Sequence, residues 1–190
     1  MRTFVKTSLG LVGLVVTGLL VGGAYVVSGS YDIGADSPHF RPVFWLANTV
    51  REHSVAAHAR GIKAPPLNDP NMILVGAGQY AAMCSGCHLA PGFDSNETRD
   101  GLYPKPPKLY AGNLMSPART FWVIKHGIKM SGMPAWGRSH DDHEMWAITA
   151  FVMQLPKLNA AQYRAIVAKA PPDDDMKQMP MPGGKPMASE

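Results

Sequence analysis

The chain has 190 residues, of which 46% are hydrophobic and 17% are charged, and it carries a formal net charge of +4 at pH 7. This length suits one compact domain with appendages and is short for two full domains. The net charge is far below that of nucleic-acid-binding proteins, so we expect no DNA or RNA partner.

The first apolar segment, residues 8–28 (SLGLVGLVVTGLLVGGAYVVS), contains 21 residues without a charge. As a helix rising about 1.5 Å per residue it is long enough to span about 30 Å of hydrocarbon. Arg2 and Lys6 precede it, so the positive-inside rule predicts a single-pass protein of a bacterial inner membrane, with residues 1–7 in the cytoplasm and the C-terminal part in the periplasm. A cleaved secretory signal is the alternative, although its apolar region is usually shorter.

Residues 30–68 are expected to form a juxtamembrane helix and a Pro-rich linker. Ser37-Pro38 or Arg41-Pro42 begins the helix, because proline is favoured in the first helical turn. The positions expected to face inward are Phe44, Val50 and Val55. The histidines of this region, His39, His53 and His58, are expected to be surface residues.

The remaining elements also read as helices, so the predicted class is all-α. Asp69 and Pro70 begin a helix that runs into the cysteines, and residues 90–112, with four Pro and three Gly, are expected to be a long ordered loop. Further helices are expected over 116–127, from the capping sequence at 139–142 to the residue before Pro156, and over 159–170. We place a compact domain at 69–158, a C-terminal helix at 159–170, and a disordered Met/Pro-rich tail at 171–190.

The motif CSGCH at residues 84–88 contains the only two cysteines of the chain. Its C-x-x-C-H spacing is typical of haem c attachment: two thiols add to the haem vinyl groups, and the following imidazole of His88 binds the iron. Three alternatives remain at this point: a thioredoxin-like redox pair, a zinc site completed by His140 and His143, and a disulfide between Cys84 and Cys87.

A methionine is the expected second iron ligand, and the chain has 12. Most are explained by packing within helices, as for Met72, Met83, Met145 and Met153. Met130 and Met133 instead lie in KHGIKMSGMPAWGRS, a loop between two predicted helices, where a thioether has no helical core to fill. One of these two is therefore the predicted ligand, with His126 as an alternative second imidazole.

The motifs CSGCHLAPG and SGMPAWG, with residues 70–156 around them, resemble a membrane-anchored single-haem class I cytochrome c. The resemblance implies a helical fold whose first and last helices cross, one covalent haem c bound through Cys84 and Cys87, and iron ligation by His88 and Met133. In the family's pattern the ligand methionine directly precedes a proline, so the resemblance implies Met133, which precedes Pro134, rather than Met130. Gly76 is expected to permit close approach of the first helix to Trp146 and Ala150.

With both axial positions filled, the resemblance implies one-electron transfer and no enzyme activity of the chain itself. The expected partners are the membrane, a quinol-linked donor and a terminal oxidase or reductase. The alternatives are a cytochrome subunit of a membrane oxidoreductase whose catalytic centre is on another chain, and a ligand-sensing or peroxidatic haem.

Three further sets of residues are candidates for interactions. A basic rim for an acidic redox partner is expected at Lys125, Lys129 and Arg138. Donors to the haem carboxylates are sought among Arg99, Tyr103, Lys108, Tyr110 and Trp136. Copper(I) binding by the tail is a hypothesis that rests on Met176, Met179, Met181 and Met187.

Overall fold

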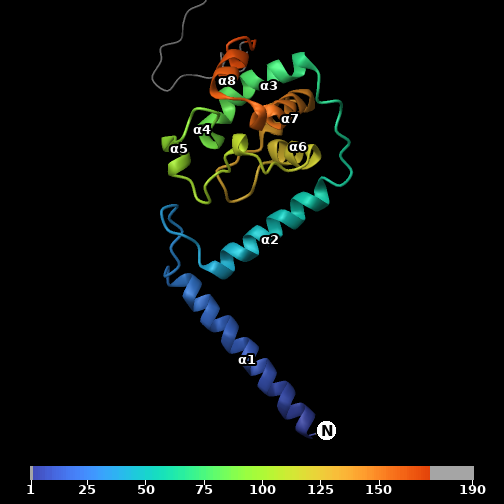
Figure 1. Cartoon of the computed structure of the whole chain (residues 1–190). Coiled ribbons are helices and arrows are strands. Elements are labelled where there is room, and N and C mark those ends of the chain that lie inside the picture. The colour runs from blue at the N-terminus through green and yellow to red at the C-terminus, as the bar shows by residue number, and fades with distance from the viewer. Residues whose placement is uncertain (1, 172–190) are drawn as a thin grey trace, which may run out of the picture. The chain divides into compact units, whose positions relative to one another are not determined.

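The computed structural model describes residues 2–171. All regular structure in this range is helical, which confirms the all-α class (Figure 1). The helices are α1 (Arg2–Val27), α2 (Arg41–His58), α3 (Pro70–Met83), α4 (Ser85–His88), α5 (Glu97–Asp100), α6 (Pro117–His126), α7 (Asp142–Gln154) and α8 (Ala160–Val167), with the 3-10 turns η1 (Leu109–Ala111), η2 (Trp136–Arg138) and η3 (Leu155–Lys157). The chain divides into two compact units between His39 and Phe40. The predicted tail and its copper(I) hypothesis lie almost wholly outside the described residues.

The first unit contains α1, whose segment Lys6–Val27 is long and apolar enough to cross a membrane, with a mean hydropathy of 2.1. A signal sequence near an N-terminus has the same properties. The helix is followed by a turn around Asp32, whose carboxylate accepts bonds from the Ser37 hydroxyl at 2.5 Å and from the backbone N–H of Gly34 at 2.8 Å. These bonds hold the pKa of Asp32 below its usual value.

The second unit is built on the crossing of α3 and α7, as predicted (Figure 1). A Cβ atom placed on Gly76 would lie 1.9 Å from the carbonyl oxygen of Ala147, so the two backbones touch at this point. The nearest atoms belong to the backbone of Ala147 and Ile148, which lie on α7 between the expected neighbours Trp146 and Ala150. The crossing is therefore tighter than a contact between side chains.

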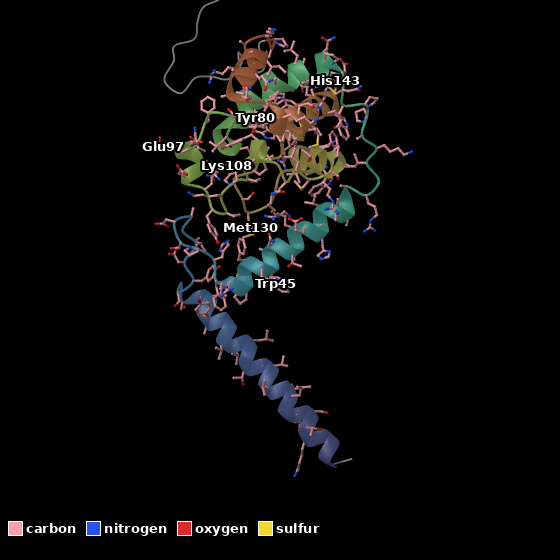
Figure 2. The ribbon with its side chains drawn as sticks, viewed as in Figure 1. Trp45, Tyr80, Glu97, Lys108, Met130 and His143 are labelled. Carbon is pink, nitrogen blue, oxygen red and sulfur yellow. The ribbon has the colours of Figure 1, made fainter. Side chains whose placement is uncertain are left out.

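The core lies between these two helices. Tyr80, Ile148 and Phe151 are fully buried, and the rings of Tyr80 and Phe151 lie 5.5 Å apart. Figure 2 shows Tyr80 among the packed helices. Its hydroxyl donates to the carbonyl oxygen of Leu89 at 2.6 Å, which ties α3 to the chain that follows the cysteine motif. A buried hydroxyl needs such a partner.

The predicted helix starts agree with the structure to within one or two residues. Asp69 accepts from the N–H of Asn71 and caps α3. The cap of α7 is Asp141, which forms a capping box with Glu144, two residues after the predicted Ser139. Asn159 caps α8, but this helix ends at Val167 rather than at residue 170.

Two expectations about irregular and surface regions are corrected. The predicted loop 90–112 contains the short helix α5, begun by Asn96 accepting from the N–H of Thr98, and the turn η1. On α2, Val55 is buried as expected, but Val50 is 59% exposed. Val50 lies on the outer face of α2 with Val43 and Leu46, at spacings of three and four residues. The opposite face of α2, which carries the buried Val55, is turned toward the rest of the unit.

Candidate functional site

The cysteine motif folds as a single helical turn that follows α3 directly. The N–H of Cys84 donates to Tyr80 at 2.9 Å, and the N–H of His88 donates to the carbonyl oxygen of Cys84 at 2.8 Å. In such a turn, residues three and four positions apart lie on one face. The C-x-x-C-H spacing therefore brings Cys84, Cys87 and His88 together locally, with no contribution from distant contacts.

The His88 ring is oriented by a second segment. Its Nδ1 donates to the carbonyl oxygen of Pro107 at 2.9 Å, since a carbonyl can only accept. Nδ1 then carries the proton, and Nε2 presents its lone pair, which is the arrangement that metal-binding histidines require. Arg99 holds this segment in place by donating from Nη2 to the carbonyl oxygen of Pro106 at 3.1 Å.

Electrostatics also favour a neutral His88. Burial lowers the pKa of the ring, the bond to Pro107 acts in the opposite direction, and the positive charge of Arg99 lowers the pKa further. The imidazole is thus ready to act as a ligand without first losing a proton. For the Cys84 thiol, burial has the opposite effect: burial and, to a lesser extent, the nearby Cys87 raise its pKa to about 12.

These side chains face a cavity of about 530 Å³. Cofactor sites occupy about 300–1,000 Å³ and are lined mainly by apolar side chains. The cavity is lined by all four predicted site residues, Cys84, Cys87, His88 and Met133. Met130 does not line it: its side chain is 98% exposed and its backbone has φ of 59°. The structure thus brings together the predicted set, while the role of each residue remains a prediction.

The loop that carries Met133 is held against the end of α6. The N–H of Ile128 donates to the carbonyl oxygen of Met133 at 3.1 Å, and the N–H of Met133 donates to the Ser131 hydroxyl at 3.2 Å. Gly127, with φ of +64°, allows the loop to come this close to the end of α6, because a Cβ atom at residue 127 would lie 2.6 Å from the Met133 carbonyl oxygen. Backbone hydrogen bonds and the close approach to Gly127 therefore fix the position of the Met133 backbone.

The three alternatives for CSGCH find no support among residues 2–171. No strand occurs there, so the βαβ setting of a thioredoxin-like pair is missing, and the high pKa of Cys84 is the opposite of an activated thiol. No group of three or more metal-binding side chains is found there, and His140 packs on Trp136, 5.9 Å between rings. Cys84 and Cys87 are not joined by a disulfide.

The other candidate residues are distributed differently from expectation. The His126 ring packs at a tilt against Trp122, with ring centroids 5.0 Å apart, and does not line the cavity. Of the five candidate carboxylate donors, Trp136 alone lines the cavity; the others, Arg99, Tyr103, Lys108 and Tyr110, do not. The cationic side chains that do line it are Arg51 and Lys105, which the sequence analysis did not select. Arg51 lies more than 30 residues before the cysteine motif, and no spacing rule links it to the site.

Residues 71–152 match the family described as "Cytochrome C oxidase, cbb3-type, subunit III". The chain contains a class I c-type cytochrome domain. This domain includes α3, the cysteine motif, the Met133 loop and most of α7, and its family implies haem c and haem-based electron transfer. The cytochrome domain does not include α2, which begins 30 residues before it.

Among solved structures, a chain of the Kuenenia stuttgartiensis reducing HAO-like protein complex Kustc0457/Kustc0458 is similar to this one, with 24% identity and a TM-score of 0.43. The similarity covers 50% of this chain and 47% of that chain, so it spans about half of either. No curated protein sequence matches this chain.

The cavity of the cytochrome domain fits a haem on its own chemistry. It offers two adjacent thiols, an imidazole whose Nε2 is available, and a thioether, all facing one largely apolar space. Soft sulfur and imidazole donors suit iron in haem proteins.

Proposed function

We propose that the protein is a membrane-tethered electron carrier that acts on the periplasmic side, with one covalently attached haem c. The observation that carries this proposal is the single cavity lined by Cys84, Cys87, His88 and Met133. The apolar segment Lys6–Val27 supports tethering, and its N-terminal basic residues support an outward-facing domain.

Each of the four predicted site residues has a defined part in this proposal. Cys84 and Cys87 would form the thioether links to the haem, His88 would hold its iron through Nε2, and Met133 would be the second protein ligand. The bound haem supplies a one-electron couple. The apolar walls exclude water, and the bond from His88 to Pro107 keeps the imidazole in one orientation. With His88 and Met133 both on the iron, no open coordination position would be left for a substrate, so we assign no catalytic residue.

A basic rim at the Met133 loop is also part of the proposal, but with fewer cations than the sequence predicted. Lys125 donates to Asp142 at 2.5 Å, and its ammonium lies 5.7 Å from the centre of the Phe121 ring. Its charge is thus partly compensated. Lys129 and Arg138 are the remaining cations proposed to steer an acidic redox partner.

The double substitution Cys84→Ser and Cys87→Ser tests covalent attachment. We expect the purified chain to lose haem-linked peroxidase staining on a denaturing gel, because serine cannot form the thioether links. The matched control is Ser85→Ala, a change between the two cysteines that leaves both thiols intact. Absence of haem from the unmodified chain, or its retention in the double variant, would refute the proposal.

A second candidate function is that of a cytochrome subunit in a membrane oxidoreductase complex. It is favoured by the exposed apolar side chains on α2, where Val43, Leu46 and Val50 follow one face and Trp45 lies 66% exposed (Figure 2). Exposed apolar patches mark interaction surfaces.

The native size of the haem-absorbing species after mild detergent extraction separates the two functions. A carrier is expected to elute as a small species, with the haem c absorbance following the 20.5 kDa chain and its detergent. A large co-eluting complex would instead establish the subunit function, and its loss in Leu46→Glu would place the contact on α2.

A further inference from the structure

Helix α2 lies outside the cytochrome domain but lines its cavity. Five of its residues do so: Phe44, Asn48, Arg51, Glu52 and Val55. They recur at spacings of three and four, so they form one face of the helix. The cavity is thus lined partly by a segment that lies outside residues 71–152, which match the family.

The position of α2 is fixed by packing along its length. Val55 is 4% exposed and the following Ala59 is 5% exposed. The Phe44 ring lies 6.4 Å from that of Tyr103, and the His58 ring stacks on Trp122 of α6 at 5.3 Å. Contacts at both ends of the helix therefore hold its middle, with Arg51, over the cavity.

A haem carries two carboxylates, which need charged or hydrogen-bonding partners when they are partly buried. Among the described residues lining the cavity, the side chains with a permanent positive charge are Arg51 and Lys105. Lys105 is 56% exposed and pairs with Asp100 at 3.3 Å. Arg51 is 36% exposed, and its planar guanidinium is suited to paired bonds with a carboxylate.

The contacts of Arg51 leave it able to bind a further carboxylate. It donates to Glu52 Oε1 at 2.8 Å and to Asn48 Oδ1, and both bonds come from Nη2. Arginine has five N–H donors, so those on Nε and Nη1 remain. Asn48 and Glu52 also line the cavity, and they keep the guanidinium on that side of α2.

We propose that Arg51 binds a carboxylate of the haem, so that α2 is a part of the haem site added to the cytochrome domain. This inference rests on the proposed haem function. It assigns α2 a role inside the protein, in addition to any contact of its outer apolar face.

The test compares Arg51→Met with Arg60→Met in the full chain, solubilised in detergent. Arg60 is an exposed arginine just after α2 that does not line the cavity. We expect Arg51→Met to lower the reduction potential, because a nearby positive charge favours the reduced haem, and to shift the carboxylate vibrations in the resonance Raman spectrum. Arg60→Met is expected to change neither, since solvent and salt screen an exposed charge.

The outcomes separate the inference from the function on which it rests. Unmodified protein without haem would refute the proposed function. Haem-containing protein in which both arginine variants behave alike would refute the role of Arg51 and leave the proposed function intact. If Arg51→Met fails to hold haem, Glu52→Gln decides: removal of this anion is expected to raise the potential, and an unchanged potential would refute the inference.

Discussion

Replacement of Met133, the proposed second iron ligand, by alanine is expected to abolish the weak far-red band that a sulfur-to-iron bond would give the oxidised protein. Replacement of Met130 is expected to leave this band intact. The reason is geometric: Met133 lines the cavity, whereas Met130 is 98% exposed on the same loop. The two substituted residues are three positions apart in one loop. Each variant therefore serves as the control for a general disturbance of that loop.

The reduction potential provides a second measurement on the same pair. Axial ligands set haem potentials over roughly 0.8 V, and thioether ligation tends to raise them, so Met133→Ala is expected to lower the potential by on the order of 0.1 V or more. Met130→Ala is expected to retain the potential of the unmodified protein. A far-red band that persists in Met133→Ala would refute the ligand assignment. An oxidised spectrum of the unmodified protein without this band would favour the ligand-sensing or peroxidatic haem.

Local sequence signals predicted much of the cytochrome domain. Asp69 before Pro70 placed the start of α3, and the C-x-x-C-H spacing placed three side chains on one helical turn. The resemblance to cytochrome c selected Met133 over Met130 through the Met-Pro pair; Met133 lines the cavity and Met130 does not, and its binding to iron stays a prediction. These features depend on residues close together in the chain, where capping, helical spacing and turn chemistry decide the outcome.

The features that sequence reasoning missed depend on distant contacts. Nothing near Arg51 indicates that α2 lies over the cavity, because that placement comes from packing against Trp122 and Tyr103. Val50 was misplaced for the same reason, since both faces of α2 carry apolar residues and the inner face is chosen by its neighbours. The His88 bond to Pro107 joins residues 19 positions apart and has no local signal.

Gly76→Ala is expected to be among the most destabilising single changes in the chain. Alanine normally stabilises a helix interior relative to glycine by about 0.5–1 kcal/mol. Here the added methyl group would lie 1.9 Å from the Ala147 carbonyl oxygen, a backbone atom that cannot rotate away. The helices must separate, so we expect a loss of about 3 kcal/mol, at the upper end of the usual cost of overpacking. Thermal unfolding of the haem-containing protein, followed by circular dichroism, measures this loss.

Gly86→Ala is the matched control. Gly86 also lies in a helix, α4, and an added Cβ atom there meets nothing within 4 Å. We expect its melting temperature to stay unchanged or rise slightly, whereas Gly76→Ala should melt at least 10 °C lower, given roughly 4–8 °C per kcal/mol for a domain of this size. Equal melting temperatures would mean that α3 and α7 do not touch at Gly76. Because the two helices carry Tyr80, Ile148 and Val152 on the cavity wall, a separated crossing should also loosen the haem site, and Gly76→Ala is expected to retain less haem than Gly86→Ala.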